Sequence, residues 1–213
     1  METQKKISVM GVLTEGISLG MKNAVSLLVA TVLWIVTIWI PYLNVGTTIA
    51  MTTIPIELSK GKVISPVFIF DSKYRKYMGE YFTLIGLMAM AVIPALFFMI
   101  VPAIVICIGW SLAIYILLDK GVAPGEAMVQ SNKATYGYKW TIFGVQFILG
   151  LAYSILSWIF GLIPFLGILL VLCVVIAYVI IGMGCSAVIY RNLTAETQEI
   201  PETTETPDVQ EEP

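Results

Sequence analysis

The sequence has no histidine and very little charge of either sign. Of its 213 residues, 12% are charged and 58% are hydrophobic, and the mean hydropathy is +0.90. A soluble domain carries about twice that charged fraction, and a compact soluble fold of this size does not bury so much apolar surface. The composition therefore excludes an ordinary soluble domain and predicts an integral membrane protein.

Residue types that commonly bind metals or carry out catalysis are scarce as well. Cys107, Cys173 and Cys185 lie singly within apolar runs, without the spacing of a zinc, haem or disulfide framework. Nucleotide-binding and nucleophile–base motifs are missing. No ionisable residue lies in the middle of an apolar run, where a proton or ion path would place one. We therefore expect no metal, no cofactor and no enzymatic activity.

What the sequence does contain is a series of six apolar runs. A helix that crosses a bilayer needs about 20 residues, with a range of roughly 17 to 25. Four runs reach that length, and two are shorter. The four longer runs are 24–40, 81–101, 140–163 and 166–190, and the shorter ones are 45–58 and 103–118. We interpret them as six transmembrane helices, and whether 45–58 crosses completely stays open at this point.

The basic residues predict the orientation of these helices. The turns at 41–46, around Pro102 and at 164–167 contain no charged residue, whereas every lysine and arginine lies in the alternating segments. Those segments are the N-terminal stretch, 59–80, 119–139 and Arg191. Because cytoplasmic loops carry the excess of Lys and Arg, the pattern predicts a multi-pass protein with both termini in the cytoplasm.

The acidic residues, in contrast, collect at the C-terminus. Seven of the fourteen acids lie after Arg191 (Glu196, Glu199, Glu202, Glu205, Asp208, Glu211 and Glu212), which leaves twelve basic and seven acidic residues before them, a net charge of +5. Their three-residue spacing would form one stripe on a polyproline II helix, which a basic partner could bind. The composition is also typical of a disordered tail, which we expect over 193–213. The basic body favours anionic lipid over nucleic acid.

An internal repeat organises the remaining chain. Ile40-Pro41, Val101-Pro102 and Ile163-Pro164 recur at intervals of 61 and 62 residues, and 56–61 matches 116–121 at four of six positions. Lys60-Gly61, Lys120-Gly121 and Arg191-Asn192 each pair a cation with a residue that tolerates the left-handed conformation, as at a helix C-terminus. The predicted fold is an all-α polytopic membrane bundle of six transmembrane helices. We expect one membrane domain, 1–192, of three repeated hairpins (1–61, 62–121 and 122–192), each preceded by an amphipathic interfacial helix.

Two short segments resemble a known group of membrane proteins. Residues 125–131 (GEAMVQS) and 136–144 (YGYKWTIFG) resemble uncharacterised six-helix prokaryotic membrane proteins related to the membrane domain of bacterial glycerophosphoryl diester phosphodiesterases. The resemblance implies a six-helix fold in a prokaryotic cytoplasmic membrane. The catalytic barrel of those phosphodiesterases has no counterpart in this sequence, so the resemblance implies no activity and transfers no functional residue.

The segment that precedes the third apolar run mixes cations with aromatic residues. Lys73, Arg75 and Lys76 are candidate contacts for anionic lipid headgroups, and each basic residue near such a surface contributes about 1 kcal/mol. The alternative is that these three residues only determine the orientation of the neighbouring helices.

Polar and small residues within the helices are the remaining candidates. Thr48, Thr52 and Gln146 are candidate intramembrane polar contacts. They would line a groove for a lipid headgroup, or they would bond to backbone carbonyls and neighbouring helices. Gly16 and Gly20 form a GxxxG pair that favours close helix packing.

Two classes of function remain open after these exclusions. We expect a non-enzymatic accessory or scaffold protein that packs with other membrane proteins or with itself, in contact with membrane lipids. The alternative is a carrier or scramblase-like protein for lipids or small amphiphiles. A continuous polar groove that joins Gln146 to the threonines would favour the carrier.

Overall fold

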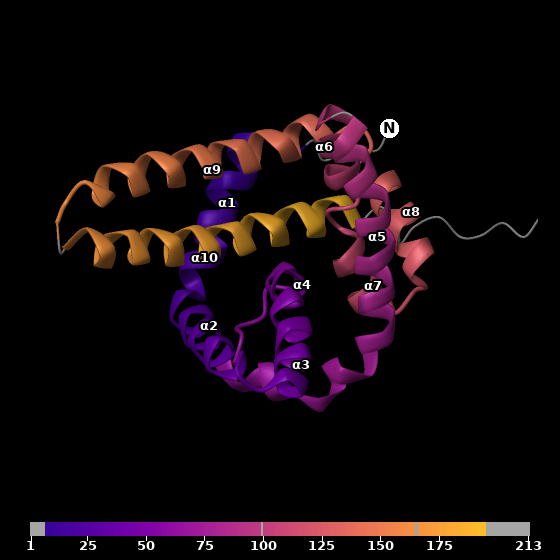
Figure 1. The fold of residues 1–213 in the computed structure, drawn as a ribbon, viewed down its shortest axis with the longest axis horizontal. Helices are drawn as coiled ribbons and strands as arrows, with labels where there is room; N and C mark the ends of the chain where they lie inside the picture. The colour runs from indigo at the N-terminus through magenta and orange to yellow at the C-terminus, as the bar shows by residue number, and fades with distance from the viewer. Residues whose placement is uncertain (1–6, 99, 165, 195–213) are drawn as a thin grey trace, which may run out of the picture.

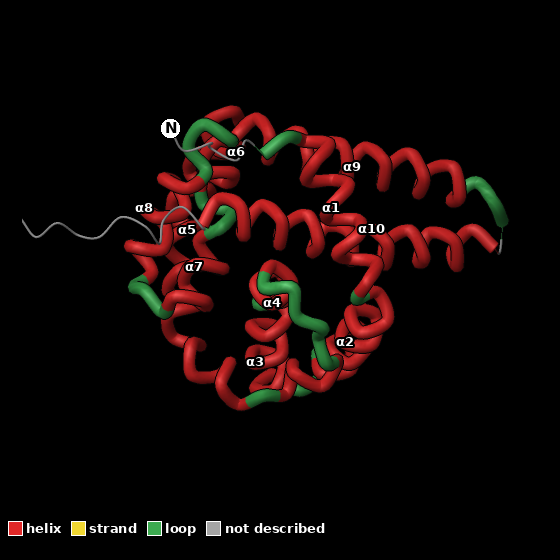
Figure 2. Tube along the Cα trace, turned by 180° about the vertical axis from the view of Figure 1, so that it is seen from behind, coloured by secondary structure: helices red, strands yellow, loops and turns green. Residues whose placement is uncertain are grey.

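The computed structural model describes residues 7–98, 100–164 and 166–194, and every regular element in these ranges is helical, as predicted (Figure 2). The elements are α1 (Val9–Lys22), α2 (Ala24–Thr37), α3 (Pro41–Thr52), α4 (Ile54–Ser59), η1 (Pro66–Phe70), η2 (Ser72–Tyr77), α5 (Met78–Phe98), α6 (Ile100–Gly109), α7 (Ala113–Lys120), α8 (Pro124–Ala134), α9 (Lys139–Gly161) and α10 (Leu166–Thr194), where η marks a 3₁₀ helix.

Four helical stretches are long and apolar enough to cross a membrane, which supports the predicted membrane protein. They are Ser72–Phe97, Ile100–Lys120, Lys139–Gly161 and Leu166–Thr194. A fifth results if α1 and α2, which are bent by 72° at their junction, form one span. The first two apolar runs form shorter elements, because α2 has 14 residues and the run 45–58 is divided between α3 and α4. Pro41 and Pro55 each lie in the first turn of a new helix, the position that proline tolerates.

The predicted helix ends are confirmed at two of three places. Gly61 and Gly121 have φ values of +69° and +65° and follow the ends of α4 and α7, so they adopt the left-handed conformation that stops a helix. Asn192 instead lies inside α10, which continues to Thr194. Leu193 and Thr194 are buried there, and the rest of the predicted acidic tail lies outside the described residues.

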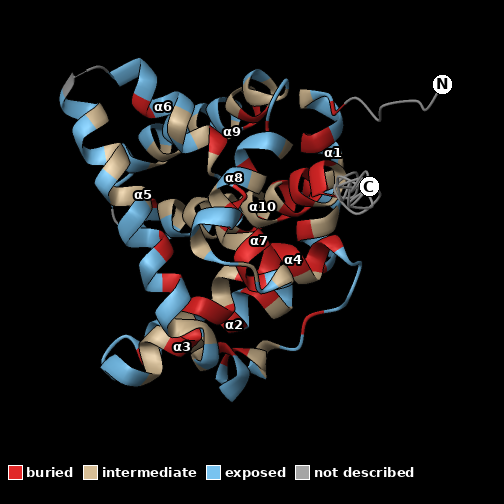
Figure 3. Ribbon diagram, turned by 90° about the vertical axis from the view of Figure 1, so that its right-hand side faces the viewer, coloured by how far each residue is buried: buried red, intermediate tan, exposed pale blue. Residues whose placement is uncertain are grey.

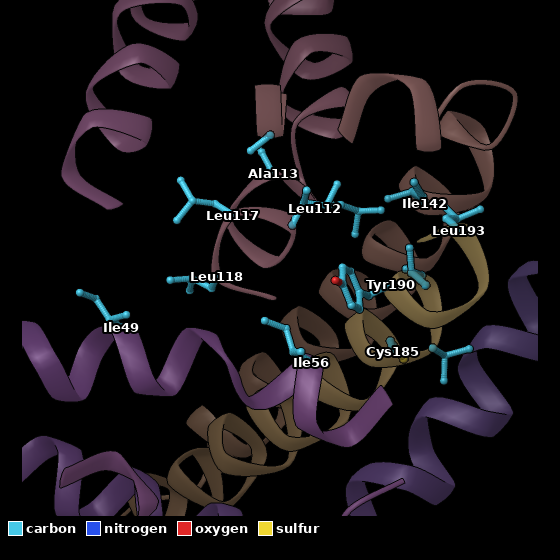
Figure 4. Close-up of a cluster of buried hydrophobic side chains, with 14 of the residues drawn as sticks. Ile49, Ile56, Leu112, Ala113, Leu117, Leu118, Ile142, Cys185, Tyr190 and Leu193 are labelled. Carbon is cyan, nitrogen blue, oxygen red and sulfur yellow. The ribbon is translucent and has the colours of Figure 1, made fainter. Parts of the chain in front are cut away.

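Helix α10 is the centre of the packing. It contacts α1, α9, α4 and α2, and it runs beside α9, as Figure 1 shows. The joined ends of α9 and α10 project beyond the other helices, whereas α5 runs across their direction (Figure 1). The larger of two clusters of buried hydrophobic residues in the described chain includes the other end of α10 and contains Ile56, Leu118 and Tyr190 (Figure 4). Figure 3 shows the same contrast between the buried residues of α4, α7 and α10 and the exposed residues of α5 and α6.

Many apolar side chains of the long helices face outward. In α9, Phe147 is 57% exposed and Trp158 is 70% exposed, and in α10, Ile168 is 82% exposed. In water such a surface would be unfavourable, but lipid tails are as apolar as these side chains. The distribution therefore suits helices that face the hydrocarbon.

The closest helix contact is the crossing of α1 and α10. A Cβ atom on Gly16 would lie 2.7 Å from the backbone nitrogen of Cys185, and one on Gly20 would lie 2.7 Å from the carbonyl oxygen of Ile180. A Cβ atom on Gly184 would collide with the carbonyl oxygen of Gly16. The two backbones therefore touch at these glycines, and any side chain would separate the helices.

We predict that Gly184→Ala destabilises the protein by about 1–3 kcal/mol, the usual cost of overpacking. Gly182→Ala is the matched control. Gly182 lies two residues before Gly184 on the same helix, and a Cβ atom there would meet no atom within 4 Å. Unfolding in detergent, followed by circular dichroism, measures both free energies of unfolding. Equal stabilities for the two variants would contradict the backbone contact.

Candidate functional site

The ends of α4, α7 and α10 meet at one carboxylate. The ammonium of Lys60 lies 2.5 Å from Oδ1 of Asp119, and the hydroxyl of Tyr190 donates to Oδ2 of the same residue at 2.7 Å. The residue after Tyr190 in α10, Arg191, forms an ion pair with Glu15 of α1. Three segments that are far apart in the chain are thus held together by polar contacts, and we name Lys60, Asp119 and Tyr190 the polar junction.

A charged cavity of about 320 Å³ lies beside the polar junction. Its charged lining residues come from three elements and are Glu57, Lys73, Lys76 and Asp119. The buried residues Thr53, Ile56 and Tyr74 also line it. The cavity therefore has a buried, partly apolar floor and a rim of both charge signs.

The three basic candidates, Lys73, Arg75 and Lys76, do not all face the same part of the structure. Lys73 and Lys76 both line the charged cavity, but Arg75 does not. The guanidinium of Arg75 lies over the ring of Tyr42, 5.8 Å from its centroid. Because η2 is a 3₁₀ helix with three residues per turn, residues 73 and 76 lie on the same side and residue 75 points elsewhere.

The charges around the cavity are partly paired. Glu57 lies 3.3 Å from the ammonium of Lys62, and Asp71 lies 3.3 Å from the ammonium of Lys73. The backbone N–H of Lys73 donates to Asp71 and thereby lowers the pKa of that carboxyl group, so Asp71 stays ionised at neutral pH. Lys76 forms no ion pair with any residue that the structure describes.

Thr48 and Thr52 line a different cavity. This space of about 350 Å³ lies between α2, α3, α4, α7 and α10, and its lining is mostly apolar. The indole N–H of Trp34 donates to the hydroxyl of Thr48 at 2.9 Å, and Thr52 donates to the carbonyl of Ile49 at 2.7 Å. The two hydroxyls therefore already bond to the neighbouring helix and to their own backbone.

Gln146 lies apart from the threonines. It is exposed on α9 and lines neither the charged cavity nor the apolar one. Within the described part of the chain, no group forms a hydrogen bond with its amide. The continuous polar groove that would join Gln146 to Thr48 and Thr52 is therefore not formed by these cavities.

The polar junction is not among the sites that the sequence predicts. Lys60 and Asp119 both lie near the C-terminal ends of the matched segments 56–61 and 116–121, and this repeat is the signal in the sequence that relates them. It did not indicate that Tyr190 approaches them, because that contact depends on how α10 packs. The described residues also include no group of three potential metal ligands.

We predict that Tyr190→Phe lowers the free energy of unfolding by about 1.5–3 kcal/mol, since it removes a hydrogen bond to a charged acceptor. The loss should be smaller in an Asp119→Asn background, because the acceptor is then neutral. Tyr136→Phe is the control, since Tyr136 is 79% exposed. Additive effects of the two junction substitutions in a double-mutant cycle would contradict the contact.

Comparisons with protein families, with curated proteins and with solved structures find no match to this chain.

Proposed function

We propose that this chain is a non-enzymatic membrane protein that acts as an accessory or scaffold subunit and packs with a second copy or with another membrane protein. The observation that carries the proposal is the exposed amide of Gln146, which has no partner within the described chain. The internal crossing of α1 and α10 already uses Gly16 and Gly20. The intermolecular contact is therefore assigned to α9 rather than to the GxxxG pair.

The proposed setting is a prokaryotic cytoplasmic membrane, crossed six times by three hairpins with both termini in the cytoplasm. Four helical stretches that are long and apolar enough to cross a membrane support the multi-pass part of this arrangement. The absence of charge from 41–46, from the residues around Pro102 and from 164–167 supports the three hairpins. The prokaryotic assignment depends on the resemblance to the membrane domain of bacterial glycerophosphoryl diester phosphodiesterases.

The position of Gln146 makes its exposure costly. It lies seven residues after Lys139, which is about 10 Å along a helix, and the exposed residues around it are apolar, including Phe147 and Leu151. An amide without a hydrogen-bond partner in an apolar medium costs several kcal/mol. A polar side chain from another helix would remove that cost.

The face of α9 around Gln146 can admit a neighbouring helix closely. Gly150 lies one helical turn further along, and a Cβ atom there would meet no atom within 4 Å. Ser154, another turn along, donates its hydroxyl to the carbonyl of Gly150 at 2.8 Å and needs no further partner. Small residues allow close approach, while an amide that both donates and accepts can pair with its own copy.

We predict that Gln146→Met weakens association, because methionine keeps the length of the side chain and removes only the amide. An interhelical hydrogen bond in a membrane contributes about 0.6–2 kcal/mol, so the dissociation constant should rise about 3- to 30-fold. Energy transfer between labelled copies in vesicles, at varied protein-to-lipid ratios, measures it. Ile148→Met is the matched control on another exposed face of α9.

The same position also tests for a different protein partner. If the wild-type protein does not self-associate, a photo-crosslinking residue at 146 in native membranes should capture one protein. Lipid adducts alone, together with a monomeric wild-type protein, would contradict the scaffold proposal.

A carrier or scramblase-like protein for lipids or small amphiphiles is the second candidate, and the cavity beside Thr48 and Thr52 is the observation that favours it. The cavity is mostly apolar, with hydroxyls and an indole at its wall, so it suits an amphiphile better than an ion.

If the carrier proposal holds, reconstituted vesicles should exchange a labelled phospholipid between leaflets, and Thr52→Trp should slow that exchange because the larger side chain fills the cavity. Val25→Trp, on the exposed face of α2, should leave the rate unchanged. A rate equal to that of protein-free vesicles would exclude this candidate.

A further inference from the structure

The charged cavity next to the polar junction plays no part in the proposed association through α9. Its volume of about 320 Å³ falls at the lower end of the range for small-molecule sites. The buried side chains of Thr53 and Tyr74 form part of its wall. The ring of Tyr74 is held edge-on against Phe68, with 6.0 Å between the ring centroids, so this wall is formed by packed residues.

The acidic side chains at the cavity already have bonding partners within the protein. Both oxygens of Asp119 are bonded, one to Lys60 and one to Tyr190. Glu57 pairs with Lys62 at 3.3 Å. A cationic ligand would therefore have to displace a lysine or break the polar junction.

The bases, in contrast, are not all neutralised. The lining residues and their ion-pair partners comprise four lysines (Lys60, Lys62, Lys73 and Lys76) and three acids (Glu57, Asp71 and Asp119), which leaves a net charge of +1. The excess positive charge is that of Lys76, which forms no ion pair within the described residues. The neighbouring Lys73 lies on the same side of η2 and adds a second ammonium group.

We propose that this cavity binds a phosphate group that carries a net negative charge, held by Lys76 and Lys73. Lysine ammonium groups bind phosphate as point charges. The two acids at the rim would repel a ligand with several negative charges, so the cavity favours a monoanion such as a phosphodiester. The cavity lies where η2 leads into the apolar helix α5, which makes the headgroup of an anionic phospholipid the nearest source, and a soluble phosphate compound shares the same chemistry.

Titration of the full-length protein in an uncharged detergent tests the proposal. The probes are short-chain phosphatidylglycerol, short-chain phosphatidylcholine and inorganic phosphate, and calorimetry measures each dissociation constant. Phosphatidylglycerol should bind, and raising the salt concentration should weaken that binding, because salt screens exposed charges. Phosphatidylcholine, whose phosphate is balanced by its own cation, should bind at least fivefold more weakly.

Two substitutions should move the affinity in opposite directions. Lys76→Gln should weaken binding of phosphatidylglycerol about fivefold, the equivalent of ~1 kcal/mol for one basic residue. Glu57→Gln should tighten it a few-fold, since it removes a negative charge from the rim; a misfolded variant would not bind more tightly. Lys22→Gln is the control, because Lys22 is exposed at the end of α1, outside the cavity.

The pattern of results identifies the ligand or overturns the site. Tighter binding of phosphatidylglycerol than of inorganic phosphate supports a lipid headgroup, and equal binding supports a soluble phosphate compound. Equal affinities for phosphatidylglycerol and phosphatidylcholine would overturn the proposal, and so would a Lys76→Gln variant that behaves like Lys22→Gln. The association of α9 is measured separately, so either proposal can fail without the other.

Discussion

The backbone contact between α1 and α10 is the constraint on which the rest of the structure depends. Gly16 and Gly184 let the two helices touch without intervening side chains. This approach brings Glu15 of α1 within pairing distance of Arg191 on α10. Because Tyr190 precedes Arg191 on the same helix, the crossing also fixes where the hydroxyl of Tyr190 can reach. The position of one apolar crossing thus determines the position of a polar contact network.

The polar junction fixes the ends of α4 and α7 relative to α10. Asp119 accepts from Tyr190 and pairs with Lys60, so α10 is bonded to the end of α7, and α7 to the end of α4. The carboxylate is only partly exposed, and a shift of any of the three helices would leave a desolvated charge with fewer partners, which is costly. The charged cavity is lined from α4, α7 and η2. Its geometry is therefore a consequence of the junction, which explains how short surface helices can form a defined site.

The sequence predicts the features that depend on local chemistry. Apolar runs, prolines and the glycines at 61 and 121 correctly indicate the helical class and two helix ends, because each acts on its own segment. Features that depend on packing or on the exact helix type are not predicted. Lys73, Arg75 and Lys76 form one basic group in the sequence, but the 3₁₀ geometry of η2 directs Arg75 to Tyr42. Likewise, the residue type of Gln146 indicates that it needs a partner, but only the packing of α9 determines that it faces outward.

In a membrane protein, the exposed groups that mark a contact surface differ from those in a soluble protein. In water, an exposed apolar patch marks a contact surface, but on these helices apolar side chains such as Ile168 are satisfied by lipid. The informative groups are polar ones whose bonding capacity the chain leaves unused. Thr48 and Thr52 do not meet this criterion, since both hydroxyls are bonded within the chain. Gln146 and Lys76 do meet it, at separate places and with different chemistry. We propose another helix as the partner of the amide, which lies among apolar side chains, and an anion as the partner of the ammonium beside the charged cavity.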